Sequence, residues 1–337
     1  MAIGTHVVDF PQPTWVAPHP RDVLHIGLVN NMADGALEQT ERQFFQLISG
    51  AGAAFRIRWH LFSLGSIARG EAARLHLMHE NYRELREIYA AKLDGVIVTG
   101  TEPGQQDLRQ ETYWPELSEL LDWIGQEGPP AILSCLAAHA AVLRYDGIER
   151  RRLMHKRCGT FDHIVADRHP LTNELTGTLK VPHSRWNEAP PDALEEAGYQ
   201  VLTYAPEAGA DLFVKQRRNL LMFLQGHPEY DHDTLAREYR RDVRRYLSGI
   251  ANDYPALPQY YFRQDEADAF ELFRKRALET RNEALLAEFP AIAADNRNRR
   301  TSALQPVFSM WLCLLKELAE KWHGAAPARI AKTSWQL

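Results

Sequence analysis

Short apolar runs alternate with segments of helical periodicity through the first half of the chain. The runs have the continuous hydrophobic composition of strands that are buried on both faces of a parallel sheet. Between them, apolar side chains recur at the spacing of an amphipathic helix. We therefore predict strands over 23–29, 55–61, 94–99 and 131–133, and helices over 37–48, 79–92, 114–124 and from 136 onward.

The second half of the chain is predicted to continue the sheet and then to become helical. Its apolar runs are short enough for strands that are joined as hairpins. The helical patterns that come after them are longer and more polar, and the first of them is dense in arginine. The predicted strands are 198–204, 211–215 and 220–224, and the predicted helices are 233–247, 266–286 and 303–322.

This order of elements predicts an α/β fold, with a doubly wound, mostly parallel sheet and a C-terminal helical extension. Prolines are frequent in the first 22 residues, which are therefore expected to form an extended arm. The predicted regions are this arm over 1–22, an α/β domain over 23–250, a helical region over 251–325 that packs on the domain, and a tail over 326–337.

The carboxyl ends of the parallel strands bring three segments to one edge of the predicted sheet, where such folds bind ligands. These segments are Asn30–Asn31, Thr99–Gly104 and Cys135. No Gly-x-Gly-x-x-Gly motif follows the first strand, and the chain has no Walker-type glycine loop. A dinucleotide site or a P-loop nucleotide site is therefore not expected.

Cys135 occupies the turn between a predicted strand and an alanine-rich helix. At that position a thiol faces the first unpaired N–H groups of the helix and the positive end of its dipole. Both features favour the thiolate, which is the nucleophilic form of cysteine. The alternative is a small buried hydrophobic side chain, since cysteine is among the residues most often buried.

His227 and Glu229 follow the predicted strand over 220–224, so the topology of the sheet can bring them beside Cys135. A histidine two residues from a carboxylate, with Pro228 stiffening the link, predicts a general base and the group that orients it. The alternative is a strand-end histidine that is hydrogen-bonded to a local turn.

A metal site is another interpretation of this segment, which contains the potential ligands His227, Glu229, Asp231 and His232. Pro228 interrupts the helix that a His-Glu-x-x-His site requires, and the spacing of the two histidines is too long for that motif. We therefore predict that no metal is bound here.

The arginine-rich helix over 233–247 contains a candidate ligand-binding face. Glu238 and Arg241 are three residues apart, so they lie on the same side of the helix. That side could meet the amino and carboxylate groups of a ligand. The alternative is that these charges form an ordinary solvated face.

The composition indicates a globular protein without a nucleic-acid or membrane partner. Of the 337 residues, 45% are hydrophobic and 25% are charged, and the net charge is −5. The three cysteines are too few and too scattered for a disulfide framework, which fits a reducing cytoplasm. The sequence shows no secretory leader and no apolar stretch of about 18 residues. We predict a soluble cytoplasmic protein.

Three motifs stand in order along the chain: Cys135 before an alanine-rich helix, then Pro182-His183-Ser184-Arg185, then Gly226-His227-Pro228-Glu229-Tyr230-Asp231. With supporting segments such as Tyr113-Trp114-Pro115, they resemble the homoserine O-succinyltransferase (homoserine transsuccinylase) family over about residues 24 to 247. The resemblance implies a class I glutamine amidotransferase-like fold, which agrees with the predicted sheet. The region 23–250 would then be the acyltransferase domain.

The resemblance also implies a ping-pong acyl transfer, the first step of methionine biosynthesis from homoserine, with succinyl-CoA as co-substrate and no bound cofactor. Cys135 would attack the acyl-CoA thioester and carry the acyl group. His227 would transfer the protons while Glu229 orients its imidazole. The backbone N–H of Leu136 and a second donor near Asn31 would stabilise the oxyanion.

Substrate-binding residues and partners are implied by the same resemblance. Lys156 and Ser184 match family residues near the acyl and substrate groups. Arg241 matches the residue expected to pair with the homoserine carboxylate, and Glu238 matches one near its amino group. Gly104 matches a position that is Gly in succinyl-transferring members and Glu in acetyl-transferring ones. The expected partners are small-molecule substrates and a second copy of the chain in a homodimer, with neither nucleic acid nor membrane.

The chain departs from the family pattern beside the nucleophile. The family usually has an aromatic residue where this chain has Leu136 and glutamine where it has His139, and Ala33 replaces a usual proline. These differences leave the acceptor open between homoserine and another hydroxylated amino acid, and acetyl-CoA is the alternative donor. Two further alternatives are a cysteine-dependent glutamine amidotransferase or hydrolase, and a non-catalytic ligand-binding protein of the same fold.

Overall fold

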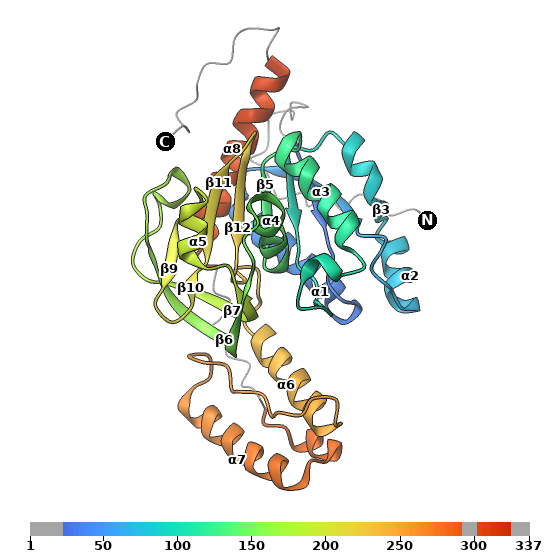
Figure 1. The fold of residues 1–337 in the computed structure, drawn as a ribbon, viewed down its shortest axis with the longest axis vertical. Helices are drawn as coiled ribbons and strands as arrows, with labels where there is room; N and C mark the ends of the chain where they lie inside the picture. The colour runs from blue at the N-terminus through green and yellow to red at the C-terminus, as the bar shows by residue number, and fades with distance from the viewer. Residues whose placement is uncertain (1–22, 292–301, 325–337) are drawn as a thin grey trace, which may run out of the picture.

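The computed structural model describes residues 23–291 and 302–324, so the predicted N-terminal arm and C-terminal tail lie outside the described residues. Its central sheet has the strand order β3-β2-β1-β4-β5-β12-β11-β8 (Figure 1). The strands from β3 to β12 are parallel, and β11 and β8 extend the sheet as antiparallel neighbours. Their bounds are β1 Val23–Val29, β2 Arg56–Ser63, β3 Arg83–Glu84, β4 Gly95–Val98, β5 Ala131–Ser134, β8 Gln200–Val201, β11 Leu212–Gln216 and β12 Leu220–Leu224.

The strand order confirms the predicted α/β class and the doubly wound, mostly parallel sheet. The chain first adds β2 on one side of β1 and later adds β4 and β5 on the other side. The direction of winding therefore reverses at β1, and the carboxyl ends of β1, β4 and β5 meet near this switch point. The predicted strands at 23–29, 94–99, 131–133 and 220–224 all lie in this central part.

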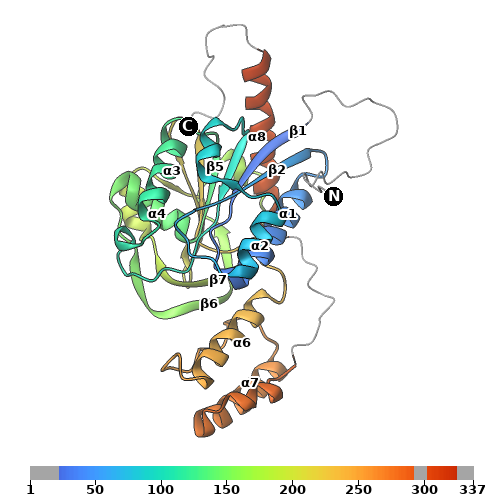
Figure 2. The same cartoon turned by 90° about the vertical axis from the view of Figure 1, so that its right-hand side faces the viewer.

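Helices cover both faces of the sheet, as Figures 1 and 2 show. Along β4, Val96 and Val98 join the core on the side of α3 and α4, whereas Ile97 joins the core on the side of α1 and α8. Burial on both faces explains why these strands are continuously apolar. The helices are α1 Leu37–Ala51, α2 Glu71–His79, α3 Trp114–Gln126, α4 Leu136–Asp146, α5 Pro191–Glu196, α6 Thr234–Leu247, α7 Gln264–Thr280 and α8 Gln305–Gly324.

The segment predicted as one helix over 79–92 is different in the structure. Helix α2 ends at His79, β3 comes next, and Leu85–Ala90 forms the short 3₁₀ helix η3. The prediction is wrong here because Arg83 pairs with Phe62 at the end of β2, which extends the chain where the helix was expected. Leu85 and Ile88 are still buried, so their spacing correctly marked core positions.

A second sheet, with the strand order β10-β9-β6-β7, was not predicted. Its main part is a long hairpin, in which residues such as Met154 are almost fully exposed. The register of the hairpin also shifts between Arg152 and Arg157, which interrupts the alternation that would have indicated a strand. The strands are β6 Arg151–Val165, β7 Leu179–Glu188, β9 Thr203–Ala205 and β10 Gly209–Ala210.

The helices after residue 250 contribute to two different cores. Helix α7 packs on α6 in a separate cluster that includes Phe270 and Phe273, and this pair of helices extends below the sheets in Figure 1. Helix α8 instead covers the central sheet, where Phe308 and Trp311 are fully buried. The C-terminal helical extension is therefore present, whereas the division at residue 250 stays a prediction.

Candidate active site

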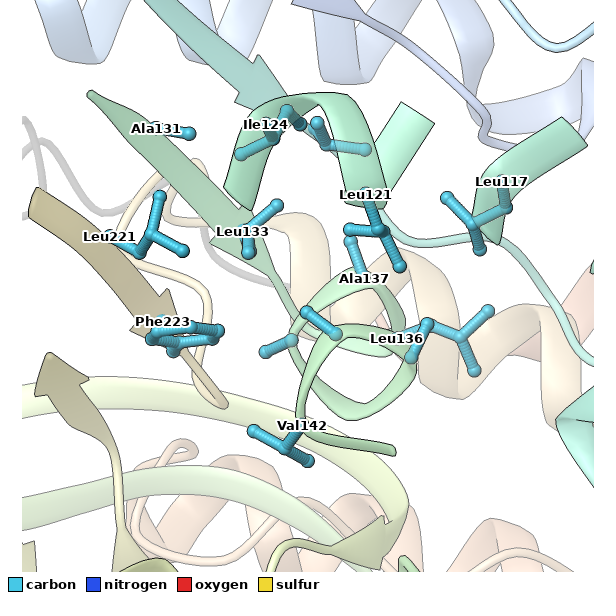
Figure 3. Packing of buried hydrophobic residues seen from close by; sticks show 14 of the residues in the cluster. Leu117, Leu121, Ile124, Ala131, Leu133, Leu136, Ala137, Val142, Leu221 and Phe223 are labelled. Atoms are coloured by element: carbon cyan, nitrogen blue, oxygen red, sulfur yellow. The ribbon is translucent and has the colours of Figure 1, made fainter. Parts of the chain in front are cut away.

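Cys135 lies at the turn between β5 and α4, as the sequence pattern predicted. Its backbone has φ 53° and ψ −111°, a conformation that costs about 1–3 kcal/mol for a residue other than glycine. The backbone N–H of Cys135 donates to the carbonyl of Leu224 on β12 at 2.7 Å. Behind the turn, Leu133, Ala137 and Phe223 pack in the core (Figure 3). This packing holds the thiol in a partly exposed position.

His227 and Glu229 lie beside Cys135 because β12 and β5 are parallel neighbours in the sheet. The Nδ1 atom of His227 is 2.8 Å from the Oε1 atom of Glu229, and both residues are buried. The Cys135 sulfur is close enough to His227 to raise the pKa of its imidazole. We call Cys135, His227 and Glu229 the thiol centre.

The charges of the thiol centre control the protonation of His227. Burial lowers the pKa of His227, but the carboxylate of Glu229 and the sulfur of Cys135 outweigh it and raise the pKa well above its ordinary value. This raised pKa favours the protonated form of the imidazole. A protonated histidine beside a cysteine stabilises the thiolate, the arrangement that nucleophilic cysteines use.

Two further contacts hold His227 in position. Its backbone N–H donates to the carbonyl of Pro182 on β7 at 2.8 Å. The ring of Tyr230 stacks on the imidazole, with ring centroids 4.2 Å apart and an angle of 17° between the planes. Gly226 permits the close approach to β7, because a Cβ atom there would lie 2.9 Å from the carbonyl oxygen of Pro182.

Leu136 and Asn31, whose backbone N–H groups are predicted to stabilise the oxyanion, differ in their surroundings. Leu136 begins α4 directly after Cys135, and a Cβ atom on Gly100 would lie only 3.0 Å from the Leu136 nitrogen. The loop after β4 thus passes close to the start of α4. The backbone N–H of Asn31 donates to the Oγ1 atom of Thr99 at 2.8 Å, so the structure engages it elsewhere.

The predicted substrate-binding residues Lys156, Ser184, Glu238 and Arg241 come from β6, β7 and α6. The hydroxyl of Ser184 donates to the Oε2 atom of Glu238, and the hydroxyl of Tyr230 donates to its Oε1 atom at 2.9 Å. Because Tyr230 also stacks on His227, these contacts connect Glu238 to the thiol centre.

Asp242 joins the two cations of this group, and its role was not predicted from the sequence. Its Oδ2 atom accepts from Lys156 at 2.7 Å, and its Oδ1 atom pairs with Arg241 at 2.9 Å. Its position directly after Arg241 was the available signal, but only the structure shows that it also reaches β6. We call the four predicted residues together with Asp242 the charged cluster.

Cys158 lies against the charged cluster and differs from Cys135. Burial raises the pKa of the Cys158 thiol to about 11, and the opposing effect of the Lys156 ammonium group is smaller. A buried thiol with a raised pKa is poorly reactive at neutral pH. Of the two, Cys135 is therefore the candidate nucleophile.

Gly104 lies exposed in the loop after β4. A Cβ atom at this position would lie 3.8 Å from the Oε2 atom of Glu111, whose Oε1 atom accepts from the Gln105 N–H at 2.6 Å. Glu102 forms an ion pair with Arg245 of α6 at 2.9 Å, and its charge also raises the pKa of Arg241.

Within residues 23–291 and 302–324, no group of three or more His, Cys, Asp or Glu side chains is arranged to hold a metal ion. The same part of the chain has no helix of the length and apolar character that crossing a bilayer requires.

The fold and the site define an α/β protein whose doubly wound sheet groups a cysteine, a histidine and a glutamate at its carboxyl edge. The sequence matches the homoserine O-succinyltransferase family over residues 17–279, and the chain belongs to that family. The homoserine O-succinyltransferase of Rhodopseudomonas palustris is 45% identical over 271 residues, covering 80% of this chain and 81% of that relative. Its counterpart in Methylorubrum extorquens is 44% identical over 307 residues, covering 90% of each chain.

Solved structures with a similar arrangement have low sequence identity to this chain. A glutamine amidotransferase from Thermotoga maritima matches with a TM-score of 0.47 and 14% identity, over 87% of this chain and 98% of that chain. A glutamine amidotransferase from Methylobacillus flagellatus matches with a TM-score of 0.46 and 13% identity, over 87% and 94% of the two chains. Similarity at this level says nothing about the reaction.

Proposed function

We propose that this chain transfers a succinyl group from succinyl-CoA to the hydroxyl of L-homoserine, through a thioester on Cys135. The observation that carries the proposal is the thiol centre, in which Glu229 and Cys135 raise the pKa of a buried histidine. The family and the names of its relatives supply the substrates. The product enters methionine biosynthesis.

In the first half-reaction, the Cys135 thiolate attacks the thioester carbonyl of succinyl-CoA. A new bond forms between the Cys135 sulfur and the acyl carbon, and the bond from that carbon to the CoA sulfur breaks. The departing CoA thiolate takes the proton of His227. The oxyanion accepts from the Leu136 N–H, and the backbone at Gly100 replaces Asn31 as the second donor because it lies against Leu136.

In the second half-reaction, the neutral imidazole of His227 accepts the proton of the homoserine hydroxyl. The oxygen attacks the acyl-enzyme thioester, and Cys135 departs as a thiolate, which restores the resting ion pair. Glu229 keeps the Nδ1 side of the ring occupied, so that the Nε2 side faces the reacting atoms. No cofactor takes part in either step.

The charged cluster is suited to an amino-acid acceptor. Arg241 is half exposed, with 48% of its side chain accessible, and can pair with the homoserine carboxylate. Glu238 can accept from the amino group while Ser184 and Tyr230 fix its two oxygens. Asp242 prevents repulsion between Lys156 and Arg241 by pairing with both.

The choice of succinyl-CoA over acetyl-CoA depends on Gly104. A glutamate here would add a negative charge to the loop beside the acyl group and would oppose the second carboxylate of succinate. Glu102 does not take this role, because it pairs with Arg245. A homodimer and a cytoplasmic location remain predictions from the family resemblance.

The direct test is mass spectrometry of the intact protein after mixing with succinyl-CoA, followed by addition of homoserine. We expect a single succinyl adduct on Cys135 that homoserine removes as O-succinylhomoserine. A protein that hydrolyses glutamine and forms no adduct with any acyl-CoA would contradict the proposal.

A further inference from the structure

Two buried hydrogen-bond donors on one side of Cys135 take no part in the proposed acyl transfer. Among the residues that the structure describes, neither the Nε atom of Arg150 nor the hydroxyl of Tyr113 has a hydrogen-bond partner. Tyr113 is 5% exposed. A buried donor without a partner destabilises the fold, so these two donors are candidates for binding a ligand.

Arg150 is fixed against the loop that carries Gly104. Its Nη2 atom donates to the carbonyls of Gln105 and Gln106, each at 2.8 Å. These two bonds use both Nη2 hydrogens and immobilise the guanidinium while leaving its Nε–H available. The arginine is therefore placed like a binding group that is preorganised before its ligand arrives.

The loop that Arg150 holds also passes the nucleophile, because a Cβ atom on Gly100 would lie 3.5 Å from the Cβ atom of Cys135. Burial lowers the pKa of Arg150, and the Tyr113 hydroxyl, the Glu111 carboxylate and the Cys135 sulfur act in the opposite direction. Arg150 in turn acts on the pKa of Tyr113. Arg150 thus interacts electrostatically with both the phenol and the sulfur, and it is bonded to the loop that contains Gly104.

The ligand that this pair of donors fits is a carboxylate. One donor is cationic and the other is a neutral hydroxyl, and the two together can donate to the oxygens of one anion. The Glu111 carboxylate acts on the pKa of both donors, and its Oε1 atom accepts from the Gln105 N–H at 2.6 Å. Arg152, two residues further along the chain, differs from Arg150 because its guanidinium group lies over the Trp186 ring, 4.3 Å from the ring centroid.

We propose that Arg150 and Tyr113 bind the distal carboxylate of the succinyl group while its carbonyl is attached to Cys135. The inference rests on the proposed function, since only a dicarboxylic acyl group presents a second anion at a fixed reach from the sulfur. Arg150 then favours succinyl-CoA by attracting its second carboxylate. Gly104 favours the same donor because a glutamate at this position would repel that carboxylate.

The test measures single-turnover acylation of Cys135 by succinyl-CoA, butyryl-CoA and acetyl-CoA, using the mass of the intact protein. Arg150→Gln should slow acylation by succinyl-CoA about 10- to 100-fold, the range of a charge-assisted hydrogen bond. Tyr113→Phe, which leaves the loop contacts intact, should slow it about 3- to 10-fold. Acylation by acetyl-CoA and by butyryl-CoA, which matches the chain length without the charge, should stay unchanged in both variants.

Arg152→Gln is the matched control and should leave all three rates unchanged. Equal losses with all three donors in Arg150→Gln, together with a neutral Tyr113→Phe, would assign Arg150 to holding the loop and would overturn the inference while leaving the proposed function intact. A wild-type enzyme that shows no preference for succinyl-CoA over butyryl-CoA would overturn both.

Discussion

The thiol centre and the charged cluster are adjacent but are built in different ways. Cys135 and His227 leave neighbouring parallel strands of the central sheet, and the side chains of His227 and Glu229 are only 10% and 4% exposed. The charged cluster comes from an antiparallel hairpin and a helix outside that sheet, and Arg241 is half exposed.

This difference in construction suits the two regions to different roles in the proposed reaction. In the proposed mechanism, bonds are made and broken where the core fixes the atoms, because a misplacement of about 1 Å can cost 100-fold in rate. The same proposal assigns substrate recognition to charges on peripheral elements, whose interactions are partly screened by water and each contribute less. Changes in the thiol centre should therefore impair both half-reactions, and changes in the charged cluster should impair the acceptor half-reaction.

The largest expected effect is that of Cys135→Ala, which removes the atom that carries the acyl group. The variant should form no succinyl adduct and no product, as measured by intact mass and by release of CoA. Cys158→Ala is the matched control from the other region and should still be acylated at the wild-type rate. A stoichiometric adduct on Cys135→Ala would show that the nucleophile lies elsewhere.

Glu229→Gln should have the next largest effect, because it removes the carboxylate that raises the pKa of His227. We expect acylation to slow by about 100-fold or more, within the range of general acid–base catalysis. The alkaline limb of the rate profile, where His227 loses its proton, should move to lower pH. Rapid-quench measurements from pH 6 to pH 10 would detect both changes.

The stability of the same variant gives an independent measurement. Since the folded pKa of His227 is raised, its contribution to the free energy of unfolding is complete below the unfolded pKa of about 6.5 and is lost as the pH rises through the folded pKa. The stability difference between wild type and Glu229→Gln should thus be largest near pH 6 and should shrink in alkaline solution. A difference that grows with pH would contradict the assigned ion pair.

Arg241→Lys tests the charged cluster alone. Lysine keeps the charge but loses the planar fork that binds a carboxylate through two hydrogen bonds. The rate with homoserine should fall by about 10- to 100-fold, equivalent to 1.5–3 kcal/mol, while acylation by succinyl-CoA stays near the wild-type rate. An unchanged KM and rate for homoserine would place Arg241 on an ordinary solvated face.

The smallest expected effect is a change in donor preference in Gly104→Glu. We expect kcat/KM for succinyl-CoA to fall about tenfold, since two like charges about 10 Å apart at an effective dielectric constant of 20 repel by about 1.7 kcal/mol. The value for acetyl-CoA should be maintained, so the preference moves toward acetyl. Gly104→Ala is the control for bulk. A wild type that prefers acetyl-CoA, with no response to Gly104→Glu, would refute the donor assignment.

Much of the thiol centre could be predicted from local sequence. Continuous apolar runs before Cys135 and His227 indicate buried parallel strands, and such strands necessarily place the residues after them at one edge of the sheet. Lys156 and Ser184 could not be predicted in this way, because the hairpin that carries them has no clear alternation of apolar and polar residues. Their prediction depended on the family resemblance rather than on the pattern.

By itself, the sequence determined the α/β class, the central strands, and the positions of Cys135 and His227 at strand ends, because these features depend on periodicity within a few residues. Only the tertiary structure decided that Asp242 bridges Lys156 and Arg241, that Thr99 engages the Asn31 N–H, and that Arg150 holds the carbonyls of Gln105 and Gln106. Such contacts join residues far apart in the chain. Their energies depend on burial and on the distance between charges, which only the packed structure specifies.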